Sequence, residues 1–129
     1  MRVLILEDDA SLLLAFTQAL EDDGHIVLAC AREDEAMNYL RYQGSTINLI
    51  VLDLFIGSRP SLSVASFAAY AAPDAEVIVV TGSDFYPNGE LHEMGHNVSW
   101  SLRKPVRMND LQALAQFTER RCSDGARSP

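Results

Sequence analysis

The sequence predicts an α/β protein in which helices cover both faces of a five-stranded parallel sheet, a doubly wound three-layer sandwich. Short apolar runs alternate five times with stretches whose apolar residues recur at helical spacing. Several of the runs are continuous, which is typical of strands buried on both faces of a parallel sheet. Because crossovers between parallel strands are right-handed, the connecting segments place helices on both faces.

Each predicted strand is a short apolar run bounded by polar or turn-forming residues. Acids follow the first run at once, and the third run ends at Asp53. The second run, which follows Gly24, is the weaker pattern. The predicted strands are Val3–Leu6, His25–Ala29, Ile47–Leu52, Glu76–Val80 and Trp100–Arg103.

The predicted helices fill the segments between and after these strands. In the first helix, apolar residues recur from Leu12 to Leu20, Asp9 or Ser11 supplies the N-cap, and Gly24 ends the pattern. Apolar spacing predicts the other four helices over residues 33–43, 61–72, 89–95 and 108–118.

Length and charge fit one globular domain. Of the 129 residues, 48% are hydrophobic, which is enough to bury a core without disulfides or a structural metal. We expect the domain to span residues 1–121, followed by a polar, disordered tail over 122–129.

The net charge of −8 disfavours direct binding to nucleic acid or to an anionic membrane. No apolar run is long enough to span a bilayer, and the first residues turn acidic too early for a signal peptide, so we expect a cytoplasmic protein.

Polar residues with complementary chemistry stand at the carboxyl ends of four predicted strands. Because these ends meet at one edge of a parallel sheet, where such folds bind ligands, we expect the residues to lie together. They are Glu7, Asp8 and Asp9 after the first strand, Asp53 after the third, Thr81 and Gly82 after the fourth, and Lys104 after the fifth.

This set of residues suits phosphoryl transfer to a carboxylate. Crowded carboxylates repel one another, and a hard cation such as Mg²⁺ relieves that repulsion. An aspartate beside the ion is a known kind of phosphoryl acceptor. The ion and Lys104, the only lysine of the sequence, would neutralise the phosphoryl oxygens, and Thr81 would donate a hydrogen bond to one of them.

With these residues in place, the chain resembles a response-regulator receiver domain over residues 1–121. The segments that carry the resemblance are Val-Leu-Ile-Leu-Glu-Asp-Asp (3–9), Leu-Ile-Val-Leu-Asp (49–53), Val-Ile-Val-Val-Thr-Gly (77–82) and Leu-Arg-Lys-Pro (102–105). The resemblance implies a flavodoxin-like fold and a two-component phosphorelay switch that needs Mg²⁺ or Mn²⁺. It implies that Asp53 accepts a phosphoryl group from the phosphohistidine of a sensor histidine kinase or a histidine phosphotransfer protein.

The resemblance also assigns roles to single residues. Asp53 is the phosphoacceptor, and Thr81 and Lys104 respond to its phosphorylation. Asp8 binds the metal directly, Glu7 binds it through water, and the backbone carbonyl of Phe55 is a third protein ligand. A shift by one residue, which makes Asp8 and Asp9 the acidic pair, stays open. The Lys104–Pro105 bond corresponds to a Lys-Pro bond that is often cis in the family.

The resemblance further implies a switch with slow autodephosphorylation and no enzymatic turnover. It controls a downstream protein or a detached output domain, and the family likeness is also compatible with a homodimer. Whether the chain is complete or part of a larger regulator stays open.

Two positions depart from the family pattern. The switch position three residues before the lysine usually holds an aromatic residue; here it is Ser101, and a bulge in the last strand would bring Trp100 there instead. The loop after Asp53 lacks the usual Pro and Asp-Gly and has Phe55 two residues after the acceptor. We hypothesise that Phe55 shields the acyl phosphate from water.

Three other functions compete with this interpretation. The altered switch favours a binding module that does not depend on phosphate. His92-Glu93-Met94-Gly95-His96 matches the H-E-x-x-H zinc motif, but the short segment contains a glycine. A solvated helix face, or a surface that meets a partner, fits it better. A hydrolase with an aspartyl nucleophile would need a second aspartate where Phe55 stands.

Overall fold

The computed structural model describes residues 1–82 and 98–125. Five parallel strands form one sheet in the order β2-β1-β3-β6-β7. The strands are β1 (Arg2–Leu6), β2 (Ile26–Cys30), β3 (Leu49–Asp53), β6 (Glu76–Thr81) and β7 (Val98–Arg103).

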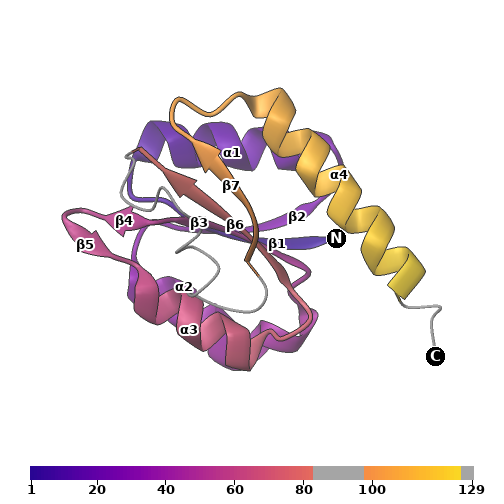
Figure 1. Ribbon diagram of the computed structural model, residues 1–129, viewed down its shortest axis with the longest axis horizontal. Helices are drawn as coiled ribbons and strands as arrows, with labels where there is room; N and C mark the ends of the chain where they lie inside the picture. The colour runs from indigo at the N-terminus through magenta and orange to yellow at the C-terminus, as the bar shows by residue number, and fades with distance from the viewer. Residues whose placement is uncertain (83–97, 126–129) are drawn as a thin grey trace.

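Four described α-helices cover the two faces of the sheet. They are α1 (Ala10–Asp22), α2 (Glu33–Gln43), α3 (Leu62–Ala71) and α4 (Met108–Gly125), and a short 3-10 helix, η1 (Gly44–Thr46), follows α2. Figure 1 shows α1 and α4 on one face and α2 and α3 on the other. The three-layer class predicted from the sequence is therefore confirmed.

Alternation along the strands divides the core between these two faces. In β1, Val3 and Ile5 join the cluster under α1 and α4, whereas Leu4 and Leu6 join the cluster under α2 and α3. All four side chains are buried, and each is worth roughly 1.5–3 kcal/mol relative to exposure. β3 lies between two strands and is buried throughout, so its end is held firmly at the centre of the sheet.

Local signals explain where the first helices begin and end. Asp9 caps α1, because its Oδ1 accepts a hydrogen bond from the Leu12 N–H at 3.0 Å. The chain leaves α1 through Gly24, whose φ of 88° is costly for other residues. Three acids occupy the first turn of α2, where the helix dipole favours negative charge.

The structure departs from the sequence prediction in two places, and one predicted segment is not described. α4 continues to Gly125, so residues 122–125, which were expected in the tail, are helical. No glycine or proline interrupts the helix before Gly125, and an ion pair of 2.6 Å between Arg121 and Glu76 holds its last turns to the sheet. The segment after Asp53 forms a small hairpin, β4 (Phe55–Ile56) and β5 (Arg59–Pro60), that was not predicted. The predicted helix over 89–95 and the H-E-x-x-H segment 92–96 lie outside the described residues.

β7 contains the bulge that the sequence suggested. Val77 of β6 pairs with Val98, but the next residue, Ile78, pairs with Trp100, so Ser99 is the extra residue. None of the described helices is both long enough and apolar enough to cross a bilayer.

Candidate functional site

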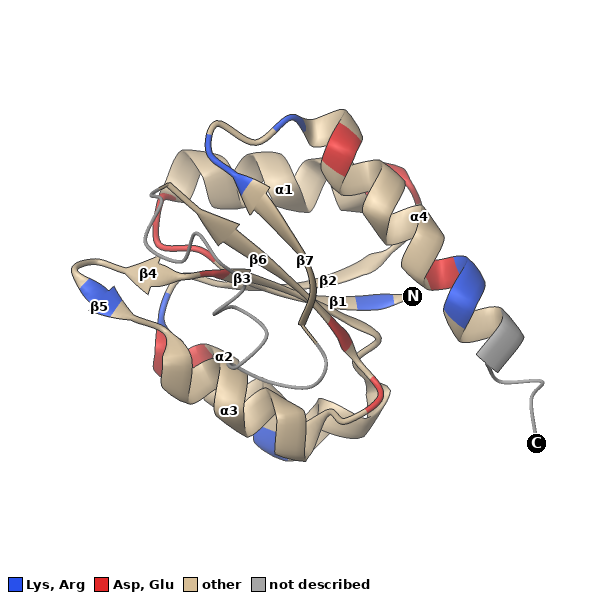
Figure 2. Ribbon diagram, in the orientation of Figure 1, with Lys and Arg blue, Asp and Glu red and all other residues tan. Residues whose placement is uncertain are grey.

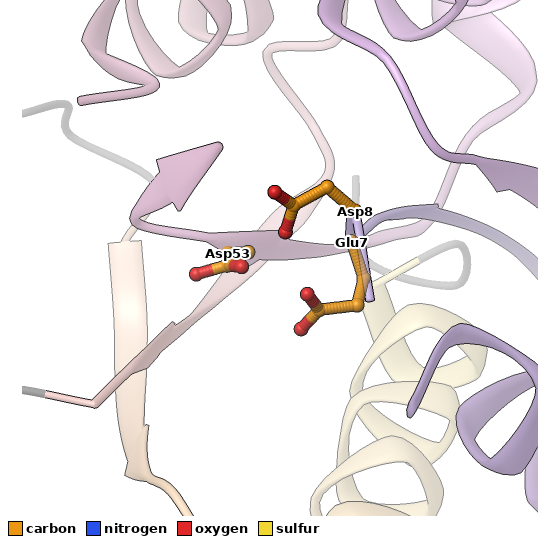
Figure 3. A group of neighbouring side chains, drawn as sticks. All are labelled: Glu7, Asp8 and Asp53. Carbon is orange, nitrogen blue, oxygen red and sulfur yellow. The ribbon is translucent and has the colours of Figure 1, made fainter. Parts of the chain in front are cut away.

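Three carboxylates converge at the carboxyl edge of the sheet. Glu7 and Asp8 follow β1, and Asp53 ends the neighbouring strand β3. One oxygen from each carboxylate lies within 4.8 Å of the other two, and Figure 3 shows the three groups turned toward one another. Glu7 and Asp53 are buried, whereas Asp8 is exposed. The structure thus brings together three of the residues predicted as metal ligands.

Hydrogen bonds separate the roles of the neighbouring acids. The carboxylate of Asp9 caps α1, and Asp9 is absent from the group of converging carboxylates. Its backbone N–H instead donates to Glu7 Oε2 at 3.1 Å. This geometry favours Glu7 and Asp8 as the acidic pair over the alternative of Asp8 and Asp9.

Lys104 reaches into the same place from the end of β7. Its Nζ lies 3.2 Å from Asp53 Oδ2 and 3.3 Å from Glu7 Oε1. Its backbone N–H donates to the Thr81 carbonyl at 2.9 Å, which holds the ends of β6 and β7 together. The Lys104–Pro105 peptide bond is cis, as the resemblance implied.

Crowding changes the acid–base behaviour of this group. Burial, then a hydrogen bond shared with Asp53, raises the pKa of Glu7 from 4.5 to about 7, although the Asp9 N–H and the charge of Lys104 oppose the shift. Burial lowers the pKa of Lys104, but the charges of Asp53 and Glu7 outweigh it and raise that pKa above its usual value. At neutral pH Glu7 of the metal-free fold is therefore about half protonated.

The chemistry of this donor set fits a hard divalent cation. Glu7 Oε1 is buried without a hydrogen-bond partner, although it has Lys104 Nζ nearby. Lys104 alone does not balance three converging carboxylates, and a cation with oxygen ligands would offset the remaining repulsion. Mg²⁺ and Mn²⁺ both accept such ligands.

An open pocket of about 440 Å³ lies over these groups. Phe55 and Gly57 of the hairpin segment and Gly82 after β6 contribute to its wall. A methyl group added at Gly82 would lie 3.7 Å from the Lys104 side chain, an ordinary contact. The lining is completed by Asp8, Asp9, Asp53 and Lys104.

The β4–β5 hairpin is hydrogen-bonded to the converging carboxylates. The N–H of Phe55 donates to Asp53 Oδ1 at 3.2 Å, and the N–H of Gly57 donates to Asp8 Oδ2 at 2.7 Å. Buried Ser61 closes the segment, since its hydroxyl lies 2.5 Å from the Asp53 carbonyl oxygen. Sequence reasoning missed Ser61; its only signal is a serine just before an apolar helical pattern.

Thr81 and Ser101 share one side of the sheet, and Trp100 lies on the other. Val79 pairs with Ser101, and Val79 belongs to the core cluster under α2 and α3. Because side chains alternate along a strand, Thr81, two residues after Val79, lies on the same side of the sheet. Trp100 packs under α1 and α4, with its ring 5.6 Å from that of Phe117. The bulge at Ser99 precedes Trp100, so it leaves Ser101 at the switch position.

Comparison with known proteins agrees with this architecture. No family model matches the chain. The chain is 31% identical over 80 residues to the alginate biosynthesis transcriptional regulatory protein AlgB of Pseudomonas aeruginosa, which covers 62% of this chain. It superimposes on a CheY-like response regulator receiver domain protein from Methanospirillum hungatei JF-1 with a TM-score of 0.81 and 22% identity, over 95% of this chain and 97% of that one. The chain has the fold of a response-regulator receiver domain.

The same receiver fold occurs in a response regulator protein from Burkholderia pseudomallei, whose structure contains a phosphorylated aspartic acid, a calcium ion and citrate. That protein is 21% identical, with a TM-score of 0.77 over 99% of this chain and 75% of that one. The resemblance predicted from the strand-end motifs is thus confirmed. The chain spans only 17% of the length of AlgB.

Proposed function

We propose that this receiver domain is a phosphorelay switch in which Asp53 accepts a phosphoryl group from a phosphohistidine. The observation that supports it most is the convergence of Glu7, Asp8 and Asp53, with Lys104 Nζ 3.2 Å from the acceptor carboxylate. The donor would be a sensor histidine kinase or a histidine phosphotransfer protein. A downstream protein or a detached output domain would read the result in the cytoplasm.

The residues at the carboxyl edge of the sheet divide the work of the transfer. A carboxylate oxygen of Asp53 forms the new O–P bond while the N–P bond of the phosphohistidine breaks, and the imidazole nitrogen keeps the electron pair and takes up a proton. When bound by Asp8, Asp53, the Phe55 carbonyl and, through water, Glu7, a divalent ion supplies positive charge for the phosphoryl oxygens. Lys104 neutralises one of these oxygens, and Thr81 donates its hydroxyl to another.

Phosphorylation would then shift a two-state equilibrium through Thr81 and Lys104. Phosphorylation removes the negative charge of the Asp53 carboxylate that Lys104 contacts and places phosphoryl oxygens nearby. A backbone hydrogen bond joins Lys104 to Thr81, so both residues would respond together to phosphorylation at the ends of two neighbouring strands.

Phe55 lies in the pocket wall and would shield the acyl phosphate from water. We therefore expect Phe55→Asn to shorten the lifetime of the acyl phosphate in a dephosphorylation time course.

Acetyl phosphate tests this proposal without a protein donor. The whole chain is incubated with acetyl phosphate and Mg²⁺, and its intact mass is measured. We expect the mass of one phosphoryl group to be added, and this gain to vanish with a chelator or in Asp53→Asn. Asp74→Asn is the matched control, because Asp74 is exposed in the turn between α3 and β6, at the other edge of the sheet. A gain that persists in Asp53→Asn would contradict the assignment.

A second candidate is a protein-binding module that does not depend on phosphate. It is favoured by Ser101 at the switch position, since a serine cannot repeat the packing of an aromatic side chain. Failure of acetyl phosphate and of phosphoramidate to modify the chain in the presence of Mg²⁺ would favour this module. Self-association into a homodimer is compatible with either function.

A further inference from the structure

The edge of the acidic pocket carries two arginines that the described part of the chain leaves unpaired. Arg59 lies in the hairpin that contributes Phe55 and Gly57 to the pocket wall, and Arg107 lies between Lys104 and α4. Both side chains are exposed. Within residues 1–82 and 98–125, no hydrogen bond or ion pair engages either guanidinium.

Four of the other described arginines have partners within the protein. Arg32 pairs with Asp34, and Arg121 pairs with Glu76. Arg2 and Arg41 donate hydrogen bonds to neighbouring side chains. Arg120 is exposed and unpaired among the described residues, but it lies beside Arg121 at the amino edge of the sheet, where β6 begins. The hairpin and the connection after β7 therefore each carry one exposed arginine that no described side chain engages, on segments that also supply pocket residues.

Each of the two arginines lies on a segment that also supplies a lining residue of the pocket. Figure 2 shows positive segments on β5 and in the connection between β7 and α4, with negative segments at the end of β1. Neither Arg59 nor Arg107 is part of the pocket wall, whereas Lys104 is. A phosphoryl group beside Asp53 would thus meet Lys104, and the arginines would face whatever surface delivers that group.

The chemistry of these side chains specifies the partner surface. A guanidinium binds carboxylates through paired N–H donors, and it keeps its charge at any physiological pH. Charges on a protein surface are screened beyond about 8 Å at physiological salt, so the arginines act on groups in contact. The net charge of −8 and the carboxylates that line the pocket would on their own repel an acidic partner, so the two arginines are the groups that could attract one.

We propose that Arg59 and Arg107 form a docking rim for a phosphodonor protein that carries carboxylates around its phosphohistidine. The inference rests on the proposed function and adds the charge of the partner surface. Arg59 would engage one side of the donor from the hairpin, and Arg107 the other side from the connection to α4. Such rim charges govern the rate and specificity of encounter.

Synthetic peptides test the docking rim directly. Three peptides carry a hydrolysis-stable phosphohistidine analogue flanked by glutamates, alanines or lysines. Their affinity for the whole chain in the presence of Mg²⁺ is measured by NMR titration at two salt concentrations. We expect the glutamate-flanked peptide to bind about fivefold or more tightly than the alanine-flanked one, with the preference lost at high salt.

Charge reversal assigns the preference to the rim. Arg59→Glu and Arg107→Glu should each remove most of the preference for the glutamate-flanked peptide. Arg120→Glu changes the net charge equally at an exposed, unpaired arginine far from the pocket, and should leave the preference intact. The proposal is overturned if the lysine-flanked peptide binds best, if no peptide binds, or if Arg120→Glu has the same effect as the rim variants.

Labelling with phosphoramidate separates this result from the proposed function. The same preparations are treated with phosphoramidate and Mg²⁺, and Asp53 modification is measured. Modified protein without a preference for the acidic peptide refutes the docking rim alone. Unmodified protein refutes the phosphorelay switch itself.

Discussion

At the scale of single residues, the site depends on carboxylates held closer together than their charges favour. Glu7 is 1% exposed, and its Oε1 has no hydrogen-bond partner among the described residues. Asp53 lies on a buried strand end, and only Asp8 of the three carboxylates is exposed to solvent. A buried carboxylate without full compensation costs stability, and this cost is what the proposed cation would offset.

Alanine variants of two adjacent acids distinguish metal binding from helix capping. We expect Asp8→Ala to weaken Mg²⁺ binding by at least about tenfold, because one of the converging carboxylates is lost. Asp9→Ala should instead lower the free energy of unfolding by about 1 kcal/mol through loss of the α1 cap, with Mg²⁺ affinity nearly unchanged. Calorimetric titration and urea denaturation measure the two effects, and a loss of Mg²⁺ affinity in Asp9→Ala as well as in Asp8→Ala would restore the pair of Asp8 and Asp9.

Glu7 should couple Mg²⁺ binding to pH. Its pKa is raised to about 7 in the metal-free fold, so at pH 6 it is largely protonated and a bound cation must displace that proton. We expect Mg²⁺ affinity to be about tenfold lower at pH 6 than at pH 8, with proton release detectable in buffers of different ionisation enthalpy. Glu7→Gln should abolish this pH dependence; an unchanged dependence in that variant would assign it to another group.

The same shift affects the stability of the metal-free protein. The folded state holds the Glu7 proton more tightly than the unfolded chain does, where the ordinary pKa is 4.5. The contribution of Glu7 to stability is therefore greatest at low pH and is lost as the pH rises toward about 7. Added Mg²⁺ should offset this loss, and its stabilising effect should be larger at pH 8 than at pH 6.

At the scale of elements, strands and helices were predictable wherever apolar spacing carried the signal. The run before Asp53 predicted β3 because strands in the middle of a parallel sheet are apolar on both faces. The β4–β5 hairpin was missed because two-residue strands are too short to show alternation. The pairing of Arg121 with Glu76, which accompanies the extension of α4, joins residues far apart in sequence and leaves no local pattern.

The hairpin should position Asp8, and two glycines allow a matched test. Gly57 has a φ of 65°, and its N–H donates to Asp8; Gly24 has a φ of 88° and lies after α1. A Cβ at either position meets no atom within 4 Å, so alanine adds only backbone strain of roughly 1–2 kcal/mol. We expect both variants to lose similar stability but only Gly57→Ala to weaken Mg²⁺ binding. Equal Mg²⁺ affinity in the two variants would remove the hairpin from the site.

At the scale of the whole molecule, topology brings the candidate site together. β1 and β3 are neighbours in the sheet although Glu7 and Asp53 are far apart in sequence, and β7 brings Lys104 to the same edge. The sequence could predict this gathering because right-handed crossovers leave few alternative arrangements. It could not predict which face Trp100 would occupy, because that depends on where the bulge in β7 falls.

Chemical trapping of the acyl phosphate tests the central claim most directly. The chain is treated with phosphoramidate, with and without Mg²⁺, and then with borohydride, which reduces an aspartyl phosphate to homoserine. Peptide mass spectrometry then reads the residue at each position. The account predicts homoserine at position 53 alone and only when Mg²⁺ is present. Homoserine at another acid, or the same yield at position 53 without a divalent ion, would contradict it.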